Sequence, residues 1–491
     1  MARFMAPAGG SAQEIERATL SQGDAALSAT IAVVARIGVA LWAAPRFPPA
    51  ADGQYFHTLA TRIAEGHGYT WLWPDGAVTA AAHYPVGYPG LLGVAYLLFG
   101  PFPGVAMALN ALFGATAALA VHRIATPFAS RGGALLAGLA VALHPGLVLY
   151  TPALMTEGVA SALLALGAWG VVRSHRIAST GKDAVKGCLL VGCTLGLATL
   201  VRPQLLLIAP LFGAFAFRDA TWRFRLQLGA VVLGTCIVFC LPWTARNCVR
   251  MHSCSLVSVN AGWNLYIGAA EGANGAWRSV DDLGVPPECR TVWDEAQKDA
   301  CFGAAGRRAI AAHPLAYAAL IPQKLATTFD YAGAAGWYLN TSNSAAFDQR
   351  AKTVLGAAET VWQRLLVIGA LVALAREGGP NQRLRWALGA VFAAFLFTRS
   401  GWIAYLGVVV LALLLGRRLL SHLPGGLGAA VVAATALTHA VFFGAGRYSL
   451  LCFPLLSALA GCAFRSQKSP VPAGTEPAGG RPNEALREAR S

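Results

Sequence analysis

Charged residues are scarce in this chain. Asp, Glu, Lys and Arg make up 12% of its 491 residues, and 56% are hydrophobic. Soluble domains contain about 25% charged residues, so this composition excludes an ordinary soluble protein. Apolar runs of about 20 residues recur along the chain, as is typical of membrane-spanning helices. Alternating patterns of about ten residues, which indicate a membrane β-barrel, do not occur. The sequence therefore predicts an all-α polytopic membrane protein.

Several binding motifs are also missing. No basic stripe with interleaved aromatic residues occurs, so the net charge of +15 does not indicate a nucleic-acid partner. Most arginines lie in short loops between apolar runs, as expected for loops on the cytoplasmic side. Without a Cys-x-x-Cys pair, no metal site or other cofactor is indicated. A Gly-rich nucleotide-binding loop is absent as well, which argues against a nucleotide-activated substrate.

Polar stretches divide the chain into five segments. We expect a cytoplasmic tail (1–24), an N-terminal transmembrane module (25–245) with an interfacial loop (46–86), an extracytoplasmic loop with interfacial helices (246–350), C-terminal transmembrane helices (351–465) and a disordered tail (466–491). The first apolar run is interpreted as a retained span, not as a cleaved signal peptide. The distribution of Arg and Lys places both loops on the extracytoplasmic face of the inner or plasma membrane.

The number of apolar runs conflicts with this orientation. Seven runs separate the two loops, and an odd number would put the loops on opposite faces. Because the charge bias is the stronger signal, we expect one run to be half of a broken or re-entrant helix. The candidate breaks are Pro101 with Pro103 and Arg202-Pro203, since proline interrupts a helix.

Asp52 is the first candidate for chemistry. It lies just beyond the first apolar run, at the head of an amphipathic stretch. A carboxylate in this position is suited to act as a general base on an acceptor held at the membrane surface. Asp is also a favoured N-cap residue, so capping of the following helix is the alternative, and the two roles can coexist.

Further charged residues occur near the predicted outer ends of apolar runs. Glu157 lies inside such a run, where a carboxylate is costly and is a functional candidate by default, with a structural hydrogen bond as the alternative. Arg202 interrupts another run and is suited to grip a phosphate, with an ion-paired or snorkelling arginine as the alternative. Arg246 and Arg447 are ordinary interface anchors when each is taken alone. Together with Arg202 they would place several positive groups on one side, which suits a lipid phosphate.

The large polar loop contains four of the ten cysteines, Cys248, Cys254, Cys289 and Cys301. A disulfide within this loop is plausible if the loop faces an oxidising compartment. Cys289 and Cys301 are the preferred pair.

Ordered short motifs give a resemblance to a known family. Asp52-x-x-Tyr55 after the first span resembles the first-loop acidic motif of multi-span glycosyltransferases, which include protein O-mannosyltransferases and lipid A aminoarabinose and galacturonic acid transferases. The stretch His83-Tyr84-Pro85 resembles the family's entry to the second span. The chain departs from the family pattern where Gly53 replaces a common Glu and Arg202 a common Lys. The remaining motifs follow in the family's order: Thr156-Glu157, Arg202-Pro203, Arg246-Asn247 and Arg447-Tyr448.

The resemblance implies a GT-C-type bundle of about 11–13 transmembrane helices, similar to glycosyltransferase family 39. It implies transfer of a sugar from a polyprenyl-phosphate donor to a protein, lipid or glycan acceptor by inverting displacement. The catalytic residues would be Asp52 and Glu157, and the substrate-binding residues would be Tyr55, His83, Tyr84, Arg202, Arg246, Asn247, Arg447 and Tyr448. The alternative is a membrane transporter or lipid flippase, against which the lack of an internal repeat argues.

Overall fold

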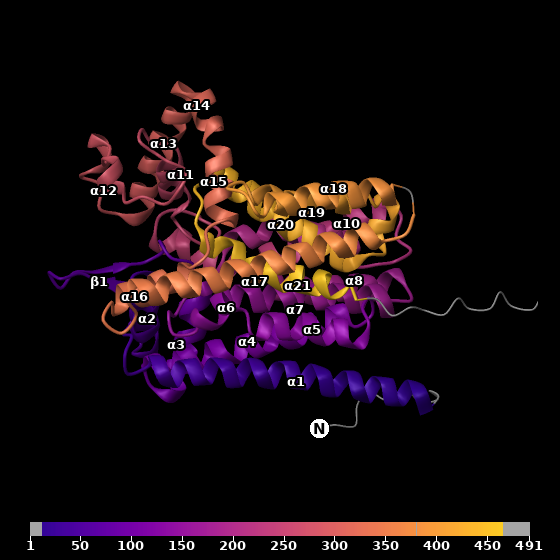
Figure 1. Cartoon of the computed structure of the whole chain (residues 1–491). Helices are drawn as coiled ribbons and strands as arrows, with labels where there is room; N and C mark the ends of the chain where they lie inside the picture. Colours follow the sequence, from indigo (N-terminus) through magenta and orange to yellow (C-terminus); the bar gives the residue numbers. More distant parts are fainter. Residues whose placement is uncertain (1–11, 380, 465–491) are drawn as a thin grey trace, which may run out of the picture.

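The chain folds almost entirely into helices. The computed structural model describes residues 12–379 and 381–464, and within them the one sheet is the hairpin of β1 and β2. Seven helices of the described part are long and apolar enough to cross a membrane, and they lie side by side as one bundle (Figure 1). The all-α polytopic class predicted from the sequence is confirmed.

The N-terminal part supplies most of the bundle. Its helices pack closely through small residues: a Cβ on Gly213 would lie 2.4 Å from the carbonyl oxygen of Leu228, so glycine lets two neighbouring helices touch. The elements are α1 (Ala12–Ala43), α2 (Asp52–Ala64), β1 (Thr70–Leu72), β2 (Val78–Ala80), α3 (Gly87–Phe99), α4 (Pro103–Ala125), α5 (Arg131–Ala142), α6 (Pro145–Leu149), α7 (Thr156–Ile177), α8 (Gly181–Val201), the 3₁₀ helix η1 (Pro203–Ile208), α9 (Ala209–Phe215) and α10 (Trp222–Arg250).

Helix α1 is longer than the expected first span. It begins at Ala12, so residues 12–24, expected to belong to a polar tail, are helical. The tail expected at 466–491 lies outside the described residues.

Helix α3 explains the odd number of apolar runs. It has 13 residues and packs along α2, with His57 Nδ1 2.7 Å from the Tyr96 hydroxyl. Its first residue, Gly87, lies against the backbone of Leu200 and Val201 at the end of α8. Both ends of α3 therefore lie at one end of the bundle, and the chain turns at Gly100 to begin α4 at Pro103. The run that became α3 is therefore the one that does not cross the bundle. It ends at Pro101 and Pro103, one of the two breaks expected from the sequence.

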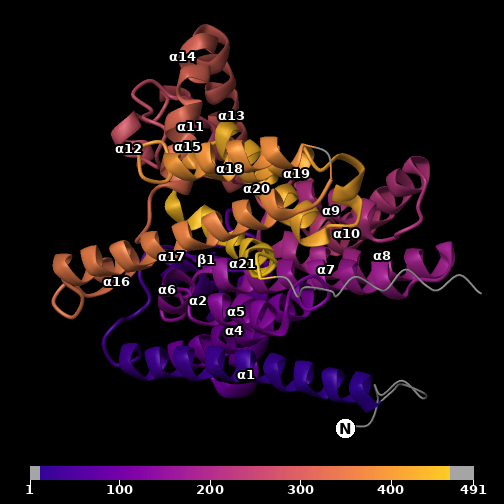
Figure 2. The same cartoon turned by 45° about the vertical axis from the view of Figure 1, so that its right-hand side comes forward.

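The large loop forms a small subdomain beyond the same end of the bundle (Figures 1 and 2). A core that includes Ile267, Phe302 and Phe443 joins it to the bundle. Two disulfides cross-link it, the preferred pair Cys289–Cys301 and a second, Cys248–Cys254. Its elements are α11 (Ala261–Ala269), α12 (Val280–Leu283), the 3₁₀ helix η2 (Pro287–Cys289), α13 (Glu295–Ala312) and α14 (Pro314–Ala319).

The C-terminal part returns to the bundle and closes over α7. The 3₁₀ helix η4 carries Arg447 and Tyr448 and packs against α7 and α15. The elements are α15 (Ile321–Phe329), α16 (Ala334–Ser342), α17 (Gln349–Arg376), α18 (Gln382–Phe395), α19 (Trp402–Leu413), η3 (Gly416–Leu420), α20 (Leu423–Val441), η4 (Gly446–Leu451) and α21 (Phe453–Gly461).

Candidate active site

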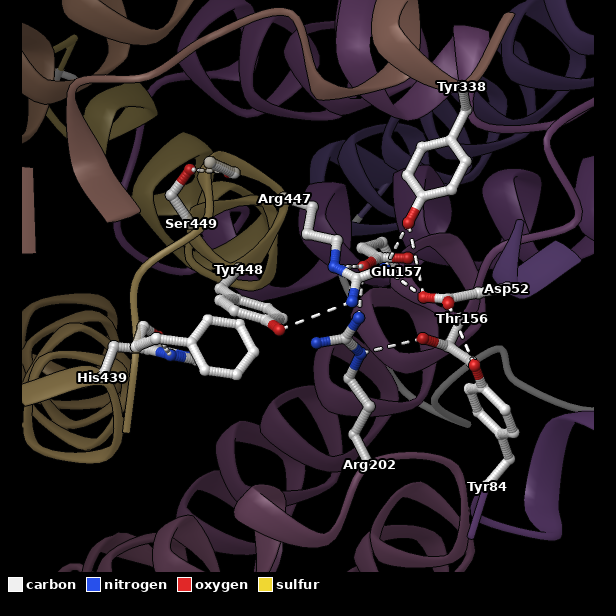
Figure 3. A network of polar contacts seen from close by, with 12 residues as sticks. Asp52, Tyr84, Thr156, Glu157, Arg202, Tyr338, His439, Arg447, Tyr448 and Ser449 are labelled. Carbon is white, nitrogen blue, oxygen red and sulfur yellow. Dashed lines mark hydrogen bonds and ion pairs between the residues drawn. The ribbon is translucent and has the colours of Figure 1, made fainter. Parts of the chain in front are cut away.

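Asp52 is the first residue of α2, and its side chain does not cap the helix. The N-cap residue is Ala51, which makes no side-chain capping bond. The Asp52 carboxylate instead turns toward the bundle, where Oδ1 accepts a hydrogen bond from the Tyr84 hydroxyl at 3.1 Å. Its Oδ2 accepts from the Tyr338 hydroxyl at 3.3 Å and from Arg447 Nη1 at 2.5 Å (Figure 3). The capping alternative therefore does not account for this carboxylate.

The charge state of Asp52 follows from these contacts. Burial raises the pKa of the Asp52 carboxyl, but the Arg447 guanidinium and the hydrogen bonds from Arg447, Tyr84 and Tyr338 outweigh burial and hold the pKa below its usual range. Burial raises the pKa of both tyrosines, which stay protonated and can donate. The Asp52 side chain is 24% exposed, so this ionised carboxylate remains accessible to a reactant.

Arg447 connects Asp52 to a second carboxylate. Its Nη1 also donates to the Tyr338 hydroxyl at 2.5 Å, and its Nη2 donates to the Tyr448 hydroxyl at 3.4 Å. On the other side, Arg447 Nε lies 3.8 Å from Oε1 of Glu157. The guanidinium of Arg447 thus lies between the two carboxylates.

Glu157 and Arg202 form a buried ion pair behind Arg447. Glu157 lies in the first turn of α7, where the positive end of the helix dipole favours a negative charge, and its side chain is fully buried. Arg202 Nη2 donates to Glu157 Oε1, and Arg202 Nε donates to Thr156 Oγ1 at 2.9 Å. Arg202 is placed by the end of α8, which stops before Pro203. Four charged groups of alternating sign therefore form one continuous network.

Tyr448 forms an aromatic wall beside the two arginines. The guanidinium carbons of Arg447 and Arg202 lie 5.2 Å and 5.4 Å from the centroid of its ring, a distance at which cations are attracted to aromatic faces. The ring also stacks on His439, with centroids 4.0 Å apart (Figure 3). This stacking fixes the Tyr448 ring and keeps its hydroxyl directed at Arg447.

Arg246 and Asn247 are not joined to this network. Arg246 Nη2 donates to the carbonyl of Tyr69 and its Nη1 to the carbonyl of Ala81, each at 2.8 Å. Asn247 is fully buried and donates to carbonyls in the loop that follows α10. Both residues therefore hold the first loop and the loop after α10 in place, and these bonds do not involve Asp52, Arg202 or Arg447.

His83 and Tyr55 flank Tyr84 on the first loop. The Tyr55 ring stacks on Tyr84 with centroids 5.2 Å apart and is 42% exposed. The His83 ring packs edge-on between Tyr84 and Trp263, and burial lowers its pKa. Neither side chain reaches Asp52 directly, so each contributes to the site through Tyr84.

Tyr338 is the residue of the network that the sequence did not indicate. It lies on α16, in a segment interpreted as interfacial, and is buried to 8% exposure. A phenol in an aromatic stretch such as Trp337-Tyr338 is common at membrane surfaces. Its place beside Asp52 follows from contacts between α16 and the chain before α2, such as the bond from Asn343 Nδ2 to the carbonyl of Arg46 at 2.9 Å.

The described residues contain no group of three His, Cys, Asp or Glu side chains arranged to hold a metal ion. The network instead offers a carboxylate next to two guanidinium groups. Such a set can take a proton from a nucleophile on one side and stabilise an anion on the other.

No protein-family model matches this chain, and no curated protein matches it in sequence. Among solved structures it is similar to the archaeal oligosaccharyltransferase AglB from Archaeoglobus fulgidus in complex with an inhibitory peptide and a dolichol-phosphate, at 13% identity and a TM-score of 0.46, over 90% of this chain and 50% of that chain. It is also similar to ArnT from Cupriavidus metallidurans bound to undecaprenyl phosphate, at 15% identity and a TM-score of 0.38, over 87% of this chain and 77% of that chain. The chain thus spans about half the length of the oligosaccharyltransferase.

Proposed function

We propose that this protein is an integral-membrane glycosyltransferase that moves a sugar from a polyprenyl-phosphate donor to an acceptor. The observation that carries the proposal is the network in which Asp52, Arg447, Glu157 and Arg202 follow one another within contact distance. The motifs that resemble multi-span glycosyltransferases supply the substrate class. A membrane-embedded bundle suits a donor whose isoprenoid chain lies in the bilayer.

Each charged group has a role in an inverting displacement. Asp52 accepts the proton of the acceptor hydroxyl or amine as that atom bonds to the anomeric carbon of the sugar. The bond from the anomeric carbon to the phosphate oxygen breaks, and polyprenyl phosphate leaves with the electron pair. Arg447 and Arg202 stabilise the negative charge of this leaving group. Glu157 positions both arginines, and Tyr84 and Tyr338 orient Asp52.

Phosphate binding and base activation are coupled through Arg447. The network contains two arginines and two carboxylates, so its formal charge is zero before a donor binds. A donor phosphate competes with Asp52 for the guanidinium of Arg447. When Arg447 turns to the phosphate, Asp52 loses its strongest partner and its pKa rises, which makes it a better base.

We also propose that the site faces the extracytoplasmic side. The large loop that carries two disulfides contacts the first loop, because Glu295 Oε2 accepts hydrogen bonds from the backbone N–H of Ala82 and His83. Disulfides persist in oxidising compartments and are rare in the cytosol. Labelling of cysteines introduced at Glu65 and at Lys182 with a membrane-impermeant maleimide in whole cells tests this side. Labelling at position 182 but not at position 65 would contradict it.

The test of the function is Asp52→Asn in purified, reconstituted protein. We expect loss of sugar transfer from a polyprenyl-phosphate sugar by about 10²–10⁴-fold, with an unchanged fold by circular dichroism. The control is Glu65→Gln, an exposed carboxylate just past the end of the same helix, which should keep full activity. Wild-type-like transfer by Asp52→Asn removes Asp52 as the base. Movement of the donor across the vesicle membrane without a covalent product would instead indicate a transporter.

A further inference from the structure

Tyr338 reaches Asp52 from a short helix that its own N-cap residue does not cap. Helix α16 has nine residues, and its N-cap residue is Gly333, which makes no side-chain capping bond. Gly333 has a φ of +96°, a left-handed conformation that favours glycine. The first N–H groups of a helix have no partner within the helix. The start of α16 therefore depends on partners from elsewhere in the chain.

Glu359 of α17 supplies such a partner. Its Oε2 accepts a hydrogen bond from the backbone N–H of Gly333 at 2.8 Å. Its Oε1 accepts from Nε2 of Gln363, one turn further along α17, at 3.1 Å, which fixes the direction of the carboxylate. Glu359 is 1% exposed, and within the described residues no lysine or arginine forms an ion pair with it. A buried carboxylate on a membrane-spanning helix is costly and is a functional candidate.

The same carboxylate lies against the helix behind Tyr338. Helices α6 and α16 both contact α17 and lie beside its first turns (Figures 1 and 2). A Cβ on Gly146 of α6 would lie 2.2 Å from Glu359 Oε1, so glycine allows this close approach. Tyr150, which ends α6, packs its ring against that of Tyr338, with centroids 5.9 Å apart. Glu359 therefore contacts both the helix that carries Tyr338 and the helix that supports its ring.

The far end of α16 has an anchor of its own. Ser342 donates to the carbonyl of Pro48 at 2.5 Å, in the segment before α2. Tyr338 lies between this anchor and the start of the helix. A helix held at one end only can pivot about that end. The Tyr338 hydroxyl is 3.3 Å from Asp52 Oδ2, so a movement of about 0.5 Å takes it out of hydrogen-bond range. The bond at Gly333 thus keeps Tyr338 within reach of the carboxylate.

We propose that Glu359 is a positioning residue of the active site, which caps α16 from α17 and so holds the Tyr338 hydroxyl against Asp52 and Arg447. The inference rests on the proposed glycosyltransferase function, in which Tyr338 orients the base. Glu359 touches no reacting atom. Its effect on transfer passes through Tyr338, which distinguishes it from a residue that only stabilises the bundle.

Fluorine NMR tests the positioning without requiring activity. The full-length protein carries 3-fluorotyrosine at position 338. Glu359→Leu removes the acceptor, and an apolar side chain of similar size is often tolerated in place of a buried charged group. We expect this variant to move the resonance toward that of free 3-fluorotyrosine. Glu359→Gln keeps an oxygen for Gly333 and should leave the resonance near its wild-type position.

A second variant tests the same contact from the opposite side. The Cβ of Gly146→Ala would push the carboxylate away from α6, so it should move the resonance in the same direction even if Glu359→Leu does not fold. The matched control is Thr353→Leu. Thr353 is an exposed residue of α17 whose hydroxyl bonds only within its own helix, and its replacement should leave the resonance unchanged.

Kinetics test the route through Tyr338. Glu359→Leu should lower transfer from a polyprenyl-phosphate sugar by about 10–10²-fold, as expected when a catalytic group is displaced. Glu359→Gln should recover most of this loss. In a Tyr338→Phe background, Glu359→Leu should add less than about a twofold further loss, because the hydrogen bond that it supports is already gone.

Three results would overturn the proposal. One is an unchanged resonance in both Glu359→Leu and Gly146→Ala. Another is a double variant in which the two losses multiply, since Glu359 would then act by a route other than Tyr338. The third is a Glu359→Gln protein as strongly affected as Glu359→Leu, since the hydrogen bond to Gly333 would then not be the cause. The expected resonance shifts without any transfer by the wild-type protein would support the placement of Tyr338 and contradict the proposed function instead.

Discussion

Replacement of Glu157 by Gln should destabilise the fold more than replacement of Asp52 by Asn. Glu157 is fully buried and contacts Arg202, which is 8% exposed. Its Oε1 also lies 3.8 Å from Arg447 Nε. At that separation and an effective dielectric constant of about 20, one charge pair contributes about 4 kcal/mol. This agrees with the roughly 3–5 kcal/mol lost when one partner of a buried pair is removed.

The Asp52 pair is more exposed and should matter less for stability. Asp52 and Arg447 are 24% and 19% exposed, so solvent screens them, and the loss of a charged hydrogen bond costs about 1.5–3 kcal/mol. We therefore expect the midpoint of thermal unfolding in detergent, followed by tryptophan fluorescence, to be highest for the wild type, lower for Asp52→Asn and lowest for Glu157→Gln. Transfer activity should be lost in both variants.

A double variant tests whether the loss of stability in Glu157→Gln is caused by the unpaired charge or by the change of shape. Glu157→Gln combined with Arg202→Met removes the buried pair together and should recover most of the stability, while activity stays low because a phosphate contact is gone. A Glu157→Gln protein as stable as the wild type would refute the reasoning, as would a double variant no more stable than the single one.

Three further predictions concern residues outside the charged network. Burial raises the pKa of Asp330 to about 7. The stability contributed by its protonated form is therefore complete below about pH 4 and is lost as the pH rises through 7. Asp330→Asn should unfold at a higher temperature than the wild type at pH 8, and its unfolding temperature should depend less on pH. Replacing Cys289 and Cys301 by Ser opens a loop of 12 residues, which should cost about 3 kcal/mol and make the large loop a target of limited proteolysis while the bundle stays intact. Gly53→Ala would put a Cβ 2.3 Å from the carbonyl oxygen of Ala153. This substitution should lower the free energy of unfolding by about 1–3 kcal/mol and lower sugar transfer by displacing Asp52. A melting temperature and activity equal to those of the wild type would show that the contact relaxes.

The bundle was predictable because apolar run length and helix length are linked in a membrane. The runs that became α4, α8 and α10 are long enough to fix their class. The run that became α3 has 13 residues, which fits a short span or a helix along the surface equally well. Its place was decided by contacts with the preceding helix α2 and with α8, which is distant in sequence, and such contacts leave no periodic signal.

The charged residues of the site could be found from the sequence because charge is rare in this chain. Their pairing could not be found. Arg246 and Arg447 have the same local appearance, an arginine next to a polar or aromatic residue at the end of an apolar run. Arg447 bonds to a carboxylate 395 residues away, while Arg246 bonds to backbone carbonyls. The difference arises from where η4 begins and where α10 ends relative to the first loop.

Gly53 shows how a departure from a family pattern can have a packing cause. Many sequences that the chain resembles carry Glu after the acidic residue of the first loop. In this protein α2 lies so close to the segment before α7 that no side chain fits at position 53. That close approach brings Asp52 toward Glu157, which lies four residues after Ala153, so that Arg447 can contact both carboxylates at once. The second carboxylate of this site is therefore supplied by α7 rather than by the residue next to Asp52, and the glycine is what allows it.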